Sequence, residues 1–255
     1  MNNSIEMPQL PEMSELWQQT LNWQPSSQEL SQFQLLYELI CQGNLQLNLT
    51  RITEPTDFWE KHLWDSLRGI TPFLDKTNSE RRTGILPVIP NSNPQIIDIG
   101  TGAGFPGIPI ALTQPNWQVT LLDSTKKKLA FLDSLISELE LKNATTLVGR
   151  SEELSKQFQY REVYDLALIR AVGSALVCAA YALPFLKVGG LAILYRGNWT
   201  EEEAVDLRST LLRLGGAIEL IDSFTTPISN SIRHCLHLRK VAVIEPNKKV
   251  KKSKH

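Results

Sequence analysis

The sequence predicts an α/β fold: a mostly parallel sheet of seven strands, with helices on both faces, behind a small helical N-terminal region. Two observations predict it. From residue 96 onward, short apolar runs alternate with segments of helical periodicity, as in proteins built from β-α units. Residues 12–70 show helical periodicity only. We therefore divide the chain into a helical region (1–74), a loop insertion (75–95), a sheet domain (96–245) and a basic tail (246–255).

The N-terminal region is predicted to hold two main helices. The first spans 26–43, where Ser26 or Ser27 is a suitable N-cap and Gly43 a stop. The second spans 56–70. Aromatic residues are dense here, and we expect them to form the region's own core rather than stacking platforms for nucleic-acid bases. They are Trp17, Trp23, Phe33, Tyr37, Phe58, Trp59 and Trp64.

Residues 75–95 contain three prolines and three asparagines without periodicity, which predicts a long loop between the helical region and the sheet. The predicted strands after it cover 95–99, 117–123, 145–149, 164–172, 191–197, 218–224 and 234–244. Helical segments separate most of them, and the one at 124–141 carries a clear apolar stripe. The last two strands have no helix between them, so we expect a closing hairpin with one antiparallel strand at the edge of the sheet.

Composition excludes several classes. No run of 18 apolar residues predicts a membrane span, and residues 1–15 lack the features of a signal peptide. The three scattered cysteines indicate a reducing compartment and no metal site. Net charge is −1 although the tail 248–255 holds five lysines, so any nucleic-acid binding must come from a local patch or from the tail.

The stretch IIDIGTGAGFPGIPIAL at 96–112 carries the strongest functional signal. Gly102, Gly104 and Gly107 match G-x-G-x-x-G between a strand and a helix, and Asp123 follows at the end of the next strand. Nicotinamide or flavin dinucleotides and S-adenosylmethionine (SAM) are both bound by loops of this spacing. The spacing alone therefore leaves the cofactor class open.

Charge favours SAM. Asp98 lies two residues before the first glycine, where a carboxylate would repel a pyrophosphate but attract the ammonium and sulfonium groups of SAM. Pro106 and Pro109 also remove two backbone donors from the start of the next helix. Asp123 is placed to accept bonds from two ribose hydroxyls in either cofactor class. Ser151 or Glu152, after the third strand, is a candidate for reading an adenine ring.

The sequence closely resembles the RsmG family, also called GidB, of bacterial 16S rRNA guanine-N7 methyltransferases. The resemblance spans roughly residues 30–245 and includes, besides the glycine loop, the segments NLTRI, HLWDS, LLDSTKKKLAFL, GRSEEL, IRAV, YRG and RH. It implies a SAM methyltransferase fold and a guanosine of small-subunit rRNA as the acceptor. Two positions depart from the family pattern: Ala103 stands where proline is frequent, and Arg196 where lysine is frequent.

The resemblance also implies roles for individual residues. Cofactor-binding positions are Gly100, Gly102 and Phe105 along the methionine and adenosine, Asp123, Ser124 and Thr125 at the ribose, Ser151 and Glu152 at the adenine, and Arg170 at the junction with the substrate; Asp98 joins them from the charge argument. Expected substrate-binding residues are His62, Asp65, Arg196 and Arg233, and expected catalytic residues are Arg170 and Arg196.

The chemistry needs positioning groups rather than a base, since guanine N7 carries a free lone pair at neutral pH. An arginine at position 170 would hold a phosphate or guanine O6 and leave N7 free; the alternative is an ion pair with an acid such as Asp98. His62 and Asp65 have a spacing that puts them on one helical face, where a purely structural pair is the alternative.

The partner expected from this reading is 16S rRNA or the small ribosomal subunit, met in the cytoplasm by a monomer that binds SAM and no metal or membrane. Three other functions remain open at this point. They are methyl transfer to a different acceptor, RNA binding or assembly without catalysis, and nicotinamide-dependent oxidoreduction.

Overall fold

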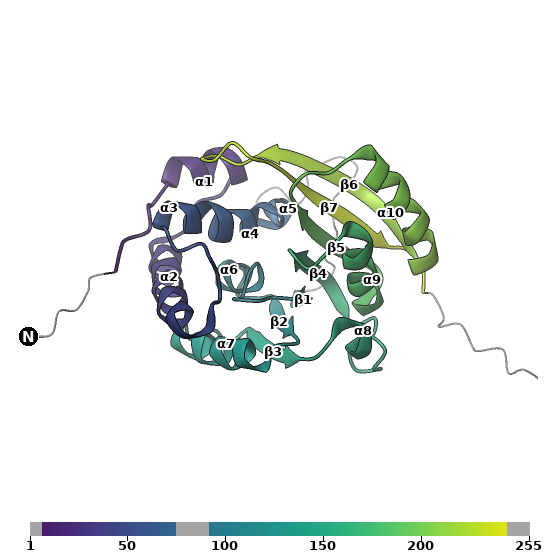
Figure 1. The fold of residues 1–255 in the computed structure, drawn as a ribbon, viewed down its shortest axis with the longest axis horizontal. Helices are drawn as coiled ribbons and strands as arrows, with labels where there is room; N and C mark the ends of the chain where they lie inside the picture. Colours follow the sequence, from purple (N-terminus) through teal and green to yellow (C-terminus); the bar gives the residue numbers. More distant parts are fainter. Residues whose placement is uncertain (1–6, 75–91, 244–255) are drawn as a thin grey trace, which may run out of the picture.

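The computed structural model describes residues 7–74 and 92–243 (Figure 1). Most of the predicted 75–95 insertion and the whole of the predicted 246–255 tail lie outside the described residues. Within them, the expected seven-stranded sheet with helices on both faces is present. The strands are β1 (Gln95–Ile99), β2 (Gln118–Asp123), β3 (Ala144–Val148), β4 (Tyr164–Arg170), β5 (Leu186–Arg196), β6 (Gly216–Thr225) and β7 (Ile232–Lys240).

The strand order is β3-β2-β1-β4-β5-β7-β6; β7 runs antiparallel to both of its neighbours, β5 and β6, and the other neighbouring pairs are parallel. The expectation of an antiparallel strand at the edge was wrong. β7 lies between β5 and β6, and β6 forms the edge. The burial of the two strands explains this: β7 contains a fully buried run from Cys235 to Leu238, whereas β6 is mostly half-exposed. A strand with such a continuously buried run is accommodated inside a sheet, where both its faces are covered.

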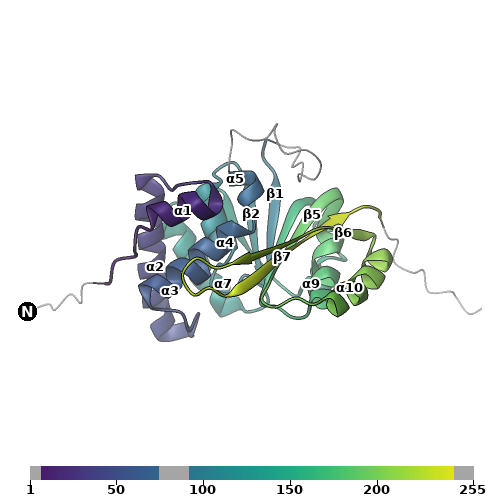
Figure 2. The same ribbon diagram turned by 90° about the horizontal axis from the view of Figure 1, so that it is seen from above.

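Alternating side chains of the central strands supply two cores. Ile96, Leu166 and Leu168 face one side, whereas Ile97 and Ile169 face the other. Figure 2 shows α2 and α7 on the opposite side of the sheet from α9 and α10. The sheet-domain helices are α6 (Gly107–Thr113), α7 (Lys126–Glu138), α8 (Ser151–Leu154), α9 (Ala175–Ala182), the 3₁₀ turn η2 (Leu183–Phe185) and α10 (Glu201–Leu214).

The N-terminal helices cover one face of the sheet. Helix α2 begins with a capping box, in which the Ser26 hydroxyl and the Glu29 carboxylate each satisfy a backbone N–H of the other residue. A π-helical turn, η1, lies between two short α-helices. The elements are α1 (Ser14–Leu21), α2 (Ser27–Leu47), α3 (Pro55–Phe58), η1 (Trp59–Trp64), α4 (Asp65–Arg68) and α5 (Thr71–Leu74).

The aromatic residues of this region are core residues, as predicted, but the region has no core of its own. Trp17, Trp59 and Trp64 are fully buried and belong to the same cluster as Leu121 and Leu168 of the sheet. The helices therefore bury their apolar faces against the sheet domain, and the two parts share one hydrophobic core.

Strand order also fixes where a ligand is expected. The chain moves outward from β1 to β2 and β3, then returns to the other side of β1 as β4. Loops at the carboxyl ends of β1 and β4 consequently leave the sheet in opposite directions. The crevice they leave is the usual ligand site of such sheets.

Candidate functional site

Asp98 holds the glycine loop from beneath. It is fully buried at the end of β1, and its Oδ2 accepts hydrogen bonds from Thr101 Oγ1 at 2.6 Å and from the backbone N–H of Gly107 at 2.8 Å. Burial raises the pKa of Asp98 to about 6, against the lowering effect of these two bonds. Its Oδ1 is buried without a hydrogen-bond partner among the described residues. The carboxylate thus both fixes the loop and leaves an unpaired acceptor beside it.

Asp123 joins the ends of β1 and β2. Its Oδ2 accepts from the backbone N–H of Gly102 at 3.1 Å, and its Oδ1 accepts from that of Thr125 at 2.8 Å. These contacts orient the carboxylate, and its remaining lone pairs stay available to a ligand. The Thr125 side chain makes no cap bond at the start of α7, so its contribution here is its backbone N–H.

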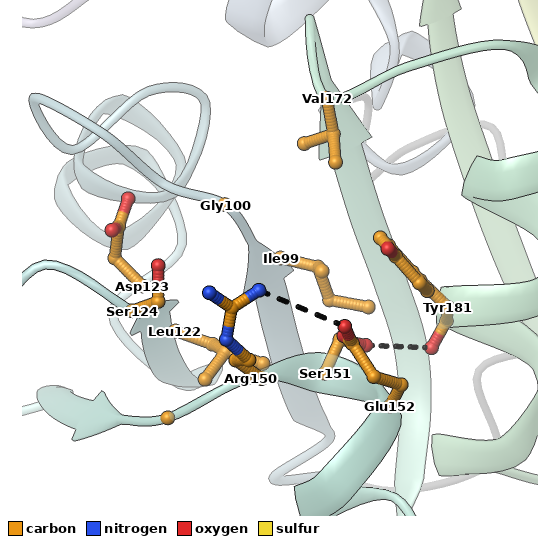
Figure 3. Close-up of a pocket in the computed structure, with 11 residues that line it drawn as sticks. Ile99, Gly100, Leu122, Asp123, Ser124, Arg150, Ser151, Glu152, Val172 and Tyr181 are labelled. Carbon is orange, nitrogen blue, oxygen red and sulfur yellow. Dashed lines mark hydrogen bonds and ion pairs between the residues drawn. The ribbon is translucent and has the colours of Figure 1, made fainter.

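A cavity of about 180 Å³ opens beside Asp123, and we call it the first cavity. In Figure 3, Asp123 and Ser124 lie on one side of it and Tyr181 on the other, with Val172 above and Ser151 below. The Ser151 hydroxyl donates to the Tyr181 carbonyl at 3.2 Å. The walls of the cavity combine two acids, Asp123 and Glu152, and Arg150 with apolar side chains. The lining residues are Ile99, Gly100, Leu122, Asp123, Ser124, Gly149, Arg150, Ser151, Glu152, Val172 and Tyr181.

Gly100 is needed where the loop passes this cavity. Its φ of +70° is a conformation that side chains disfavour, and a Cβ there would lie 2.6 Å from Val172 Cγ2. The loop backbone and the segment just after β4 are therefore in close contact at the wall of this cavity.

Arg170 lies at the end of β4 and contacts the N-terminal helices. Its Nη1 donates to Asp65 Oδ2 at 2.8 Å and to the Lys61 carbonyl at 2.9 Å. Arg170 thus forms the ion pair that the sequence analysis gave as the alternative, but its partner is Asp65 and not Asp98. Asp98 interacts with Arg170 only through its charge, without a direct contact. Both partners are largely buried, so the pair is shielded from solvent.

A second cavity, of about 270 Å³, lies on this side of Arg170. More charged side chains line it than line the first cavity, and they come from η1, from α4 and from β4 and β7. The turn between β6 and β7 adds Thr226 and Ser229. Its lining residues are Ile52, Glu60, Lys61, His62, Asp65, Arg170, Ala171, Thr226, Ser229 and Arg233. Four residues predicted to act on the substrate or at the junction, His62, Asp65, Arg170 and Arg233, therefore meet here.

The two cavities share a wall. Arg170 and Ala171 line the second cavity, and Val172, the next residue, lines the first. Ala171 has a φ of +57°, which is rare for a residue with a side chain and turns the backbone sharply between the two. A molecule bound in the first cavity and a second molecule bound in the second cavity would thus come together at this turn.

His62 is held as a neutral ring. Its Nε2 contacts Thr50 Oγ1 at 2.9 Å, and its Nδ1 lies 3.4 Å from Arg170 Nη2. Arginine only donates, so Nδ1 accepts and Nε2 carries the proton. Burial, with Arg170 nearby, lowers the pKa of His62 to about 3. The ring also stacks on Phe105 at 4.2 Å between centroids, which fixes its plane.

Not every predicted site residue lines a cavity. Phe105 is buried between His62 and Phe58 and is absent from the first cavity's lining. Arg196 donates to the Gly173 carbonyl at 2.6 Å and faces Glu203 at 3.5 Å, outside both cavities. The Arg196 side chain therefore does not lie with the other predicted site residues. Its catalytic and substrate-binding roles stay predictions.

Sequence reasoning missed several residues that line the two cavities, Tyr181, Glu60 and Val172 among them. Tyr181 reaches the first cavity from α9, and Glu60 reaches the second from η1. Val172 was noted only as part of a motif. Glu60 did leave a trace: it is an acid among aromatic residues in a stretch whose periodicity predicts burial.

The sheet order, the glycine loop and an acid at the end of the second strand define the class of SAM-dependent methyltransferases. A family model described as rRNA small subunit methyltransferase G, GidB, matches residues 29–234. Curated relatives with the name ribosomal RNA small subunit methyltransferase G are similar over nearly their full length. The protein of Trichormus variabilis is 60% identical over 238 residues, 93% of each chain. That of Microcystis aeruginosa is 51% identical over 231 residues, 91% of this chain and 99% of the relative.

The chain therefore belongs to the rRNA small subunit methyltransferase G family. This decides between the two cofactor classes that the loop spacing left open, in favour of SAM. No helix within residues 7–74 and 92–243 has the length and apolar character to cross a membrane.

Proposed function

We propose that this protein transfers a methyl group from SAM to N7 of a guanine in 16S rRNA of the small ribosomal subunit. One structural observation supports the transfer geometry most: the turn Arg170–Val172 separates a cavity of nucleoside-binding character from a charged cavity. Family membership supports the rRNA acceptor, since the relatives are named for it.

The residues present fit SAM. The Asp123 carboxylate suits a ribose diol, and the apolar Leu122 and Val172 suit the faces of an adenine ring in the first cavity. The unpaired, buried Oδ1 of Asp98 fits a cationic ligand beside the loop and would oppose a pyrophosphate. We assign Gly100, Gly102, Ser124 and Glu152 to the same site; Phe105 and Thr125 would support it from behind. When bound, SAM supplies an electrophilic methyl group on its sulfonium.

The residues of the second cavity would position the guanine. N7 has a lone pair and no proton at neutral pH, so transfer needs no general base. His62 accepts from Arg170 and is neutral, and we assign it to orienting the Arg170 guanidinium. Arg170 has further N–H donors for guanine O6 or a neighbouring phosphate. Arg233 and Lys61 at the cavity wall add positive charge for the RNA backbone.

The test of this function is transfer of labelled methyl from SAM to small ribosomal subunits that lack the modification, followed by digestion to nucleosides. We expect the label in 7-methylguanosine. Naked 16S rRNA assayed in parallel decides which form is the substrate. Label in a different nucleoside would contradict the acceptor, and bound SAM without label would favour the non-catalytic alternative.

The Asp98 assignment has its own test. Asp98→Asn keeps an oxygen for Thr101 and Gly107 but removes the charge, and it should weaken SAM binding. Calorimetric titration measures this. The affinity for an uncharged ligand of the same shape as SAM should differ little between the native protein and the variant. An unchanged affinity for SAM itself would contradict the charge argument. We further propose that the protein acts in the cytoplasm as a monomer. Analytical sedimentation in solution measures its oligomeric state.

A further inference from the structure

Glu60 is a buried acid at the wall of the second cavity, and the mechanism above gives it no role. It belongs to η1 and is only 2% exposed. Its Oε1 accepts the backbone N–H groups of Ile228 at 2.6 Å and Ser229 at 2.9 Å. The carboxylate thereby attaches the turn between β6 and β7 to the N-terminal helices.

Both of these hydrogen bonds end on the same oxygen. A carboxylate offers about four acceptor positions over its two oxygens, so Oε2 keeps acceptor capacity that the two bonds do not use. Burying an ionised group is costly unless its acceptors are satisfied. The acid Asp65 differs in its charge rather than in its free oxygen: it already forms an ion pair with Arg170, whereas Glu60 forms no ion pair with a described residue. Glu60 is thus the acid of the second cavity whose charge is not paired with a described cation and whose Oε2 can accept from an incoming donor.

Guanine has two different edges. N7 and O6, on one edge, are acceptors, whereas N1–H and the N2 amine, on another, are donors. Methyl transfer requires N7 to face the shared wall at Arg170–Val172. The donor edge then faces away from that wall, toward the rest of the cavity, where η1 and the β6–β7 turn supply Glu60, Thr226 and Ser229.

We infer that Glu60 reads the donor edge of the acceptor guanine, with N1–H and the N2 amine donating to its carboxylate. This rests on the proposed function. Adenine would set an unprotonated N1 lone pair against the carboxylate, and the unsatisfied charge would oppose its binding. Glu60 is accordingly a specificity-determining residue, and Arg170 is the residue that holds the opposite edge.

The experiment compares guanosine with inosine, which lacks the N2 amine, at the one mapped acceptor position of reconstituted small subunits. Native protein should lose about 10- to 100-fold in kcat/KM with inosine, because one buried acceptor loses its donor. In Glu60→Ala and Glu60→Gln the guanosine-to-inosine ratio should fall close to one. Glu60→Gln keeps an oxygen for Ile228 and Ser229, so it holds the turn while removing the charge.

Glu54→Gln is the matched control, since this substitution makes the same chemical change at an exposed residue of the same segment. It should keep the native ratio, and SAM affinity should be the same in all four proteins. A purely structural role would lower transfer to both substrates equally, and an unchanged ratio in both Glu60 variants would overturn the inference. If native protein forms no 7-methylguanosine at all, the proposed function fails, and this inference with it.

Discussion

Arg170 connects more parts of the site than any other residue we have described. Its guanidinium contacts Asp65, the Lys61 carbonyl and the His62 ring, and it lies 5.8 Å from the centre of the Phe105 ring. The residue comes from the sheet, whereas most of its partners come from the N-terminal helices. A planar, five-donor group suits this position, because it satisfies several acceptors and still offers N–H groups to a base.

Replacing Arg170 with lysine should separate transfer from cofactor binding. A single ammonium cannot reproduce the contacts to Asp65, Lys61 and His62, so we expect methyl transfer to fall by about 100-fold. SAM affinity, measured by calorimetry, should change little. The control is Arg239→Lys, which alters an arginine paired with Glu219 away from both cavities. Equal loss of SAM binding and transfer would remove the substrate role of Arg170.

Gly107 tests the packing beneath the glycine loop. A Cβ at this position would lie 2.3 Å from Leu121 Cδ2 and 2.8 Å from Asp98 Oδ2, both in the buried core. Gly107→Ala should therefore displace Asp98 and lower both the free energy of unfolding and SAM affinity, by about 1–3 kcal/mol in stability. Gly197→Ala, where the nearest atom is 3.5 Å away, should have neither effect. Denaturant unfolding and calorimetry measure the two quantities; a fully stable Gly107→Ala would be inconsistent with this packing.

Sequence alone predicted much of the first cavity but less of the second. Gly100, Asp123 and Ser151 follow strand ends, and strand ends converge in a parallel sheet. Tyr181 could not be predicted in this way, because it comes from a helix whose orientation depends on packing. Phe105 was expected along the cofactor but packs on His62, a contact between residues 43 positions apart that no local pattern encodes.

At the scale of elements, the start of helix α2 illustrates where local sequence is sufficient; the predicted stop at Gly43 was wrong, because the helix continues to Leu47. The Ser26 hydroxyl accepts from the backbone N–H of Glu29 at 3.2 Å, and the Glu29 carboxylate accepts from that of Ser26 at 2.7 Å. Both contacts lie within four residues, so the sequence predicted this end of the helix correctly. Its two candidates for the N-cap, Ser26 and Ser27, were distinguished only by the structure.

The two serines make a paired test of that cap. Ser26→Ala removes the acceptor for the Glu29 N–H and should destabilise the protein by about 1 kcal/mol. Ser27→Ala lies one position inside the helix and should change stability by no more than a few tenths of that amount. Chemical denaturation of the two variants measures the difference. The reverse ranking would place the cap at Ser27.

The order of the last two strands shows where local sequence was insufficient. A hairpin fixes that β6 and β7 pair, but it does not determine which of them pairs with β5. The competition is decided by burial: Cys235, Leu236 and Leu238 of β7 fill both faces next to β5. The sequence pattern alone does not predict this order, because polar residues interrupt the apolar residues of both strands: Glu219 and Asp222 in β6, His237 and Arg239 in β7.

At the scale of the whole molecule, the shared core is the main structural finding. Leu36 of α2 and Leu168 of β4 belong to one cluster, although they were assigned to separate regions of the sequence. A site built from η1, α4 and the ends of β4 and β6 requires this arrangement, because Arg170 and Asp65 must keep one relative position. Sequence periodicity indicated which residues are buried but not that two regions bury them together.

A shared core predicts one unfolding transition. Leu36→Ala, on the N-terminal face, and Leu207→Ala, on the opposite face, should each cost about 2–5 kcal/mol and shift the same transition to lower temperature. Differential scanning calorimetry checks this. A separate low-temperature transition in Leu36→Ala alone would mean that the helical region unfolds independently of the sheet.

Two buried histidines predict loss of stability in acid. Burial lowers the pKa of His62 to about 3 and of His237 to about 4, so the unfolded chain binds protons before the folded protein does. Stability from these groups is complete above pH 6.5 and is lost as pH falls toward 4 and 3. Asp98 has the opposite effect: its pKa is raised to about 6, so the folded protein binds this proton first and the contribution of Asp98 to stability increases as pH falls from 6 to 4.

His237→Gln isolates one of these contributions. The variant has no titrating group at this position, so the stability difference between native protein and variant should be constant above pH 7. Between pH 6.5 and 4 the native protein should lose on the order of 2–3 kcal/mol relative to the variant. Urea unfolding at a series of pH values measures it. A difference independent of pH would show that His237 is not held neutral by burial.

The measurement that tests the central claim most directly is the yield of 7-methylguanosine per unmodified small subunit after incubation with labelled SAM. The account predicts a single methyl group per subunit at saturation, carried by guanine N7, and almost none with Arg170→Ala despite SAM binding. Label at another base, or transfer that survives the loss of the Arg170 side chain, would contradict it.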